Sequence, residues 1–151
     1  YRCMYDQNDY IVYQDGIARV IEVENNQVII EDYISQEIKN INHHHIIRKI
    51  CSLETIKDIL ERIEFIRTVY APQKKVLEEL YQEAMMKYDE LEWVKVIKSV
   101  YVREKMKKAY SFERAYRIQA EHFLNSEISI LLQIPEEEVN QYIINSIHEN
   151  G

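Results

Sequence analysis

The spacing of the apolar residues changes once along this chain, near Cys51, and this change constrains the class of fold. Before it, short β-branched stretches alternate with polar residues, and after it apolar residues recur every three or four positions. Only two Gly and two Pro occur among 151 residues, which favours long elements with few tight turns. The sequence therefore predicts an α+β protein, with a β domain over residues 1–50 and a helical domain over residues 51–151.

Short strands account for the first domain. Residues 9–13 are rich in β-formers, Gly16 supplies a turn that tolerates positive φ, and further strands are predicted over 17–23, 27–31, 38–41 and 46–47. So few short antiparallel strands cannot form a sandwich, but they can close into a small SH3- or Tudor-like β-barrel. Barrels of this kind usually bind other molecules, so we expect a binding module.

Helices account for the second domain. Ser52 is the expected cap of a first helix, which we expect to end before Pro72 because a residue preceding proline disfavours the helical conformation. Apolar residues over 76–88 and 93–101 mark two more helices, and a fourth is expected from a cap at Ser111 to Leu132. Pro135 is expected at the first helical position of a fifth. The helices form a bundle, and no apolar run could cross a membrane, so we expect no membrane partner. Cys3 and Cys51 have neither metal-site nor disulfide spacing, so we expect two free thiols in a reducing cytoplasm.

Positive charge is concentrated in one stretch of this acidic chain. Residues 95–117 carry eight cations and two anions, although the net charge of the protein is -7. Charge sorted in this way along a chain indicates that one surface binds a polyanion, and nucleic acid is the polyanion that we expect. The candidate DNA-binding residues are Lys95, Lys98, Arg103, Lys105, Lys107, Lys108, Arg114 and Arg117.

Other chemical motifs are weak. In a strand, His43 and His45 would share a face and could bind Zn²⁺, but no third ligand has a suitable spacing, so we interpret 43–45 as a polar loop or edge strand. The chain lacks the Gly-x-Ser-x-Gly motif and a glycine-rich phosphate loop. We therefore expect no enzyme, no catalytic residue, no metal, no cofactor and no small-molecule substrate. Trp93 continues an apolar helical stripe and is expected in the core.

Two segments resemble the CarD/CdnL family of bacterial transcription factors. Residues 9–20, DYIVYQDGIARV, are similar to the family's opening strand, glycine turn and second strand. Residues 111–114, SFER, followed by Ala120-Glu121 and by residues 126–132, SEISILL, are similar to the end of its helical domain. The sequence departs from the family at Gln14, where proline is usual, and near Lys74-Lys75, where some relatives carry a tryptophan.

The resemblance implies a function in transcription regulation. It implies a Tudor-like domain that binds the RNA polymerase β subunit and a helical domain that contacts promoter DNA with little dependence on base sequence, and so modulates open-complex stability. By position, it implies polymerase contacts at Val28, Ile30 and Lys39. The cationic residues would then face DNA phosphates.

Two rival interpretations stay open. Residues 130–143 resemble a helix-turn-helix, which would make the chain a sequence-specific repressor, although its second helix begins with three acidic residues. The chain could also be a protein-binding adaptor that makes no DNA contact, or a metalloprotein that uses its histidine cluster.

Overall fold

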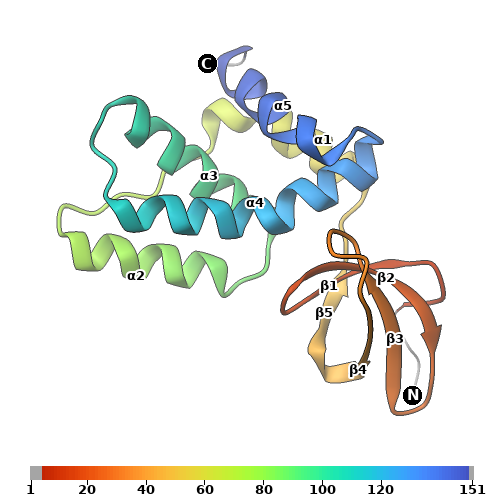
Figure 1. Cartoon of the computed structure of the whole chain (residues 1–151). Coiled ribbons are helices and arrows are strands. Elements are labelled where there is room, and N and C mark those ends of the chain that lie inside the picture. The colour runs from red at the N-terminus through yellow and green to blue at the C-terminus, as the bar shows by residue number, and fades with distance from the viewer. Residues whose placement is uncertain (1–4, 150–151) are drawn as a thin grey trace. The chain divides into compact units, whose positions relative to one another are not determined.

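The protein has an α+β fold, in which a five-stranded antiparallel sheet is followed by five α-helices (Figure 1). The computed structural model describes residues 5–149, so Cys3 lies outside the described residues. The chain divides into two compact units between Cys51 and Ser52. We call them the sheet unit and the helical unit.

The sheet unit consists of β1 (Tyr10–Tyr13), β2 (Gly16–Val23), β3 (Gln27–Asp32), β4 (Ile38–Asn42) and β5 (Ile46–Lys49). Neighbouring strands pair in the order β4-β3-β2-β1-β5, which leaves β4 and β5 as the edges. All five strands lie close to the positions that the sequence predicts. The sheet is open, since no pairing joins β4 to β5 within residues 5–149.

Tight hairpins connect the first three strands. Tyr13 pairs with Gly16, and Gly16 takes a φ of 153°, as its place in the predicted turn requires. The turn after β2 is closed by a hydrogen bond of 2.9 Å from the main-chain N–H of Glu24 to the carbonyl of Gln27. The core of the unit lies on one face of the sheet. Its buried residues are Tyr5, Ile11, Tyr13, Ala18, Val20, Val28 and Ile30.

The helical unit consists of α1 (Leu53–Glu61), α2 (Lys74–Met85), α3 (Glu90–Lys105), α4 (Ser111–Leu132) and α5 (Glu136–Glu149). The longest helix, α4, packs against each of the other four (Figure 1). Trp93 is fully buried and stacks on Phe123 at 5.1 Å between ring centroids, which confirms its predicted place in the core.

Three predicted helix boundaries are wrong. The Ser52 hydroxyl does cap α1, but α1 ends at Glu61 and not before Pro72. A 3₁₀ turn, η2 (Ile63–Phe65), follows, and its carbonyls bond to a lysine of α3 instead of continuing the helix. The cap of α4 is Tyr110 and not Ser111, and α5 begins one residue after Pro135. Over residues 5–149, no helix has both the length and the apolar character that crossing a membrane requires.

Candidate nucleic-acid interface

The turn between α3 and α4, together with the last residue of α3 and the first turn of α4, carries the exposed and unpaired positive charge of the predicted stretch. After α3, the N–H of Lys107 bonds to the carbonyl of Glu104 and that of Lys108 to the carbonyl of Arg103, at 3.0 and 2.9 Å. This pair of bonds is the Schellman arrangement that ends many helices, and it places Lys107 in the left-handed region with a φ of 57°. The turn thus holds consecutive lysines in a defined backbone conformation.

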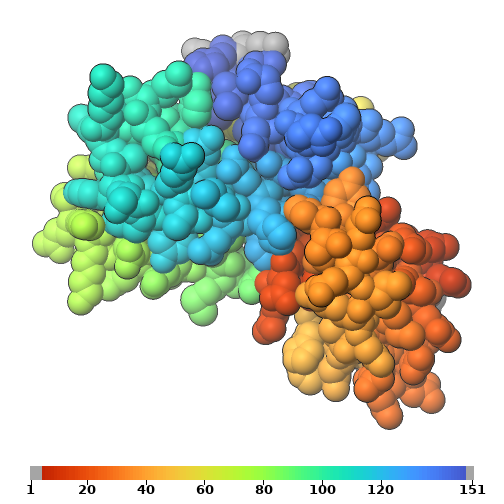
Figure 2. All heavy atoms as spheres, in the orientation of Figure 1, coloured from red at the N-terminus to blue at the C-terminus, as the bar shows by residue number. Residues whose placement is uncertain are grey.

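Four of the eight predicted cations are exposed and make no ion pair with a carboxylate within the described part of the chain. They are Lys105, Lys107, Lys108 and Arg114. The segment that carries them forms part of the open surface seen in Figure 2, where it is coloured green to blue-green. We call these four residues the cationic turn. They are the part of the prediction that the structure brings together at the surface.

Lys98 has a structural role. Its Nζ donates to the main-chain carbonyls of Ile63, Glu64 and Ile66 at 2.8, 3.0 and 2.8 Å, so it holds η2 against α3. Burial lowers the pKa of Lys98, although the nearby Glu64 carboxylate opposes this shift. Because its three donors are engaged, Lys98 is poorly placed to bind a phosphate.

Arg103 lies at the edge of a buried network. Its Nε donates to Glu113 at 2.8 Å, and the Tyr81 hydroxyl donates to the same carboxylate oxygen at 2.8 Å. The other oxygen of Glu113 accepts the main-chain N–H of Tyr110 at 2.6 Å, so this fully buried carboxylate also caps α4. The hydrogen bond to Glu113 raises the pKa of Arg103, and burial followed by the bond to Glu113 raises that of Tyr81. Arg103 therefore joins α3 to α4.

Two further predicted cations are paired with carboxylates. Lys95 lies 3.6 Å from Glu92 on the same helix. Arg117 bonds to Glu104 and lies 3.5 Å from Glu121. Burial raises the pKa of Glu121, and the guanidinium of Arg117 partly offsets that effect. These pairs leave Lys95 and Arg117 with less charge to offer a polyanion than the residues of the cationic turn.

Two residues beside the cationic turn were not predicted. Lys74, at the start of α2, places its Nζ 5.3 Å from the centre of the Tyr110 ring, and the Arg103 guanidinium lies 5.6 Å from the same ring. Lys74 therefore adds positive charge near the turn, and Tyr110 places a partly exposed aromatic ring there. The sequence gives no local signal that Lys74 lies close to Tyr110, because α2 and the turn are far apart along the chain.

A groove runs beside the cationic turn within the helical unit. It has a volume of about 560 Å³ and lies between the non-helical segment that precedes α2 and the last turns of α3. Its walls include Tyr70 and Tyr110, the apolar side chains of Val102 and Met106, and the cation Lys108. The groove thus combines aromatic, apolar and positively charged surfaces.

The three predicted polymerase-contacting residues have different environments. Val28 and Ile30 are fully buried in the core of the sheet unit, so their side chains are not available to a partner in this fold. The main chain of β3 pairs with β2 on one side and with β4 on the other, so it offers no free edge to a partner either. Lys39 lies on the edge strand β4, where it pairs with Ile30 and keeps 30% of its side chain exposed.

Lys39 belongs to a polar cluster. Its Nζ donates to the Tyr13 hydroxyl at 3.3 Å and lies 3.6 Å from Asp15 and 3.8 Å from Glu37. The Tyr13 hydroxyl in turn donates to the Asp32 carboxylate. Burial, followed by the bond to Asp32, raises the pKa of Tyr13. Burial alone would raise the pKa of Asp32, but hydrogen bonds from Tyr13, Ser35 and Ile34 lower it below its ordinary value.

The histidine cluster forms the short 3₁₀ turn η1 (His43–His45) and not a strand. The Nε2 of His43 lies 2.7 Å from the Glu24 carbonyl, and its Nδ1 bonds to the Tyr5 hydroxyl. Both ring nitrogens are therefore engaged with the protein. Of the two structures expected for residues 43–45, a polar loop or an edge strand, the chain thus forms a turn.

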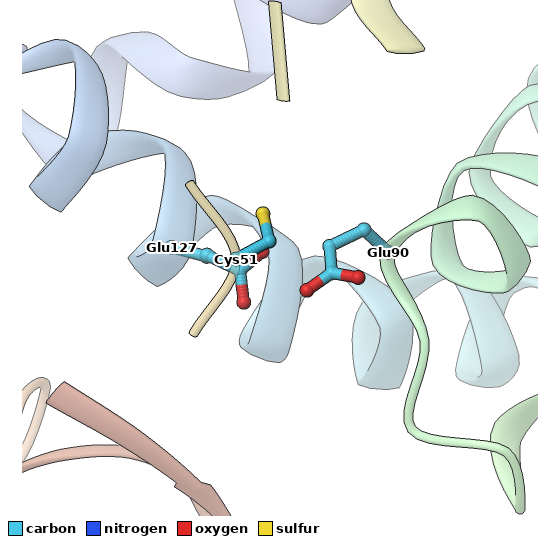
Figure 3. A group of neighbouring side chains, drawn as sticks. All are labelled: Cys51, Glu90 and Glu127. Carbon is cyan, nitrogen blue, oxygen red and sulfur yellow. The ribbon is translucent and has the colours of Figure 1, made fainter. Parts of the chain in front are cut away.

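Two buried carboxylates of the helical unit, Glu90 and Glu127, lie close together. The side chain of Glu90 extends from the start of α3 toward Glu127 on α4 (Figure 3), and carboxylate oxygens of the two lie within 4.8 Å. This unit thus provides two carboxylates, fewer than the three protein ligands usual in a zinc site. We assign no metal to it.

The predicted helix-turn-helix segment does form two helices joined by a short turn. Helix α4 ends at Leu132, Gln133 takes a φ of 56°, and α5 begins at Glu136. However, the first turn of α5 contains Glu136, Glu137 and Glu138. A recognition helix usually contacts bases and phosphates near its N-terminus, and here that end would repel them.

No family model matches the sequence, and no curated protein matches it.

Proposed function

We propose that this protein is a bacterial transcription regulator of the CarD/CdnL type. In this proposal the sheet unit is a Tudor-like domain that binds the RNA polymerase β subunit, and the helical unit binds promoter DNA with little dependence on base sequence. The observation that carries the proposal is the cationic turn, in which Lys105, Lys107, Lys108 and Arg114 are exposed in an acidic protein. The similarity of residues 9–20 to the opening of that family supports the assignment of the sheet unit.

The geometry of the cationic turn favours phosphate contacts over base reading. Lysine and arginine side chains on a turn bind the phosphate backbone, and such contacts carry little sequence information. The helix that would have to read bases in a repressor, α5, begins with three glutamates. We therefore place the DNA contact at the cationic turn and not at α5.

The salt dependence of DNA binding tests this proposal. Each phosphate contact to duplex DNA contributes about -0.9 to the slope of log affinity against log salt concentration. Lys105→Gln and Lys108→Gln should each reduce the magnitude of that slope by about one. Fluorescence anisotropy with a labelled duplex, measured at several salt concentrations, gives the slopes.

Lys98→Gln is the matched control, since it removes a lysine that bonds to three carbonyls. It should leave the salt slope unchanged while lowering the thermal stability of the protein. A slope that changes equally in all three variants, or DNA binding that does not depend on salt, would contradict the assignment of the cationic turn.

Polymerase binding is tested separately through Lys39. The intact chain should retain bacterial RNA polymerase in a pull-down, and Lys39→Glu should abolish retention because it reverses the charge on the exposed edge of the sheet. Arg48→Glu, on the opposite edge strand β5, is the matched control. If the wild-type chain retains no polymerase, the CarD/CdnL assignment fails.

A sequence-specific repressor is the second candidate, because α4 and α5 are joined by a short turn. A footprint restricted to one palindromic site, with strong loss of binding when that site is scrambled, would favour it over the first proposal.

A further inference from the structure

The groove beside the cationic turn has the size and lining of a ligand site. Its volume of about 560 Å³ lies within the range of pockets that bind small molecules, roughly 300 to 1,000 Å³. Tyr70 is 64% exposed and Met106 is 54% exposed, which is unusual for large apolar side chains that share one depression. These exposed surfaces are available to pack against a flat apolar group.

The segment of residues 68–72 forms one wall of the groove. The N–H of Val69 donates to the Ser99 hydroxyl at 2.6 Å and ties this wall to α3. The N–H and C=O groups of Thr68 and Tyr70 make no hydrogen bond to another group within residues 5–149. Both residues are exposed, so water can satisfy these groups, and a ligand with donors and acceptors along one edge can replace that water.

The charge of the groove favours an anionic ligand. Lys108 lines it without a carboxylate partner in residues 5–149, and Lys74 lies beside Tyr110 at its border. Arg103 also lines it, but its charge is partly neutralised by Glu113. A nucleotide combines the three required features, namely a flat base, a polar base edge and a phosphate. The volume of the groove suits a single unpaired base, because a base that is paired within a duplex would first have to leave the stack.

We propose that this groove binds one unpaired nucleotide of a DNA strand, with the base between Tyr70 and Met106 and the phosphate at Lys108. The inference rests on the proposed function, since DNA reaches the groove through the cationic turn. It adds a preference for DNA with an unpaired end over fully paired DNA, because only an unpaired base can stack between these two side chains. This preference should depend little on the identity of the base.

The test compares a fully paired labelled duplex with the same duplex carrying an unpaired thymidine overhang. The wild-type chain should bind the overhang DNA about tenfold more tightly, which is the effect expected of one stacked base. The double variant Tyr70→Ala/Met106→Ala should lose this preference and keep its affinity for the duplex. Met86→Ala/Tyr142→Ala is the matched control, since these residues are also exposed but do not line the groove.

Two results on DNA would overturn the inference. One is a wild-type chain with equal affinity for both DNAs, and the other is a groove variant that weakens both affinities by the same factor. If the wild-type chain binds no DNA, the proposed function fails, and a titration of the intact chain with thymidine monophosphate then decides the groove. Changes in NMR chemical shift confined to Val102, Met106 and Tyr110 would support a nucleotide site. The absence of such changes would overturn the proposed site.

Discussion

Glu113 is the buried charge on which the start of α4 depends. Its carboxylate accepts from Arg103, from Tyr81 and from the N–H of Tyr110, which satisfies three donors at once. Glu113→Ala should lower the free energy of unfolding by about 3 kcal/mol, because it removes the carboxylate that accepts from the buried Tyr81 hydroxyl and from the largely buried Arg103 guanidinium. Urea unfolding followed by circular dichroism measures this change.

The control for Glu113→Ala is a surface ion pair. Arg62 lies 3.1 Å from Asp58, and both side chains are well exposed. Arg62→Ala should change the free energy of unfolding by less than about 1 kcal/mol. A similar loss of unfolding free energy in both variants would mean that Glu113 does not hold α3 and α4 together.

Asp32 gives the sheet unit a pH-dependent contribution to stability. Its folded pKa is lowered below 3.8, so the stability that its carboxylate contributes is present above that pH and is lost as the pH falls through the folded pKa. Asp32→Asn removes this titration. The difference in unfolding free energy between the wild type and Asp32→Asn should therefore shrink as the pH is lowered below about 3.8. Urea titrations at several pH values measure it, and a difference that stays constant with pH would contradict the role of Asp32.

At the scale of elements, the end of α3 shows a conflict between stability and charge. Lys107 holds the left-handed conformation that glycine adopts without steric cost, and the chain has only two glycines. Lys107→Gly should therefore raise the free energy of unfolding by about 1 kcal/mol, since the side chain no longer strains the turn. The same change should weaken DNA binding, because it removes one cation from the turn.

Lys107→Ala separates these two effects. It removes the cation but keeps a Cβ in the left-handed region, so it should weaken DNA binding as Lys107→Gly does without any gain in stability. Thermal unfolding and anisotropy on the same samples provide both readouts. Equal stability of the alanine and glycine variants would show that the backbone at Lys107 is not strained.

At the scale of the whole molecule, the two units are expected to bind different partners. The exposed lysines of the cationic turn belong to the helical unit, and Lys39 belongs to the sheet unit. Lys39→Glu should abolish polymerase retention and leave the affinity for duplex DNA within about twofold of the wild type. Lys105→Gln/Lys108→Gln should weaken binding to duplex DNA and leave polymerase retention unchanged. Pull-down and anisotropy on both variants test this separation, and loss of both activities in either variant would contradict it.

Much of the fold could be predicted from the sequence because it depends on local rules. Alternating side chains indicated the strands, Gly16 indicated the first hairpin, and Ser52 indicated the start of α1. The end of α1 could not be predicted in the same way. Ile63 and Ile66 continue the helical spacing, but Lys98, distant in sequence, stabilises a 3₁₀ turn there by bonding to its carbonyls.

The sequence by itself determined that positive charge is concentrated over residues 95–117, and that strands precede helices. Only the tertiary structure decided which cations stay at the surface, because Lys98 and Arg103 are engaged by groups that the fold brings from other elements. It also decided that Val28 and Ile30 face the core, and that the segment before α2 meets α3 to form the groove. The physical reason is that periodicity follows from local backbone geometry, whereas burial and pairing depend on which elements pack together.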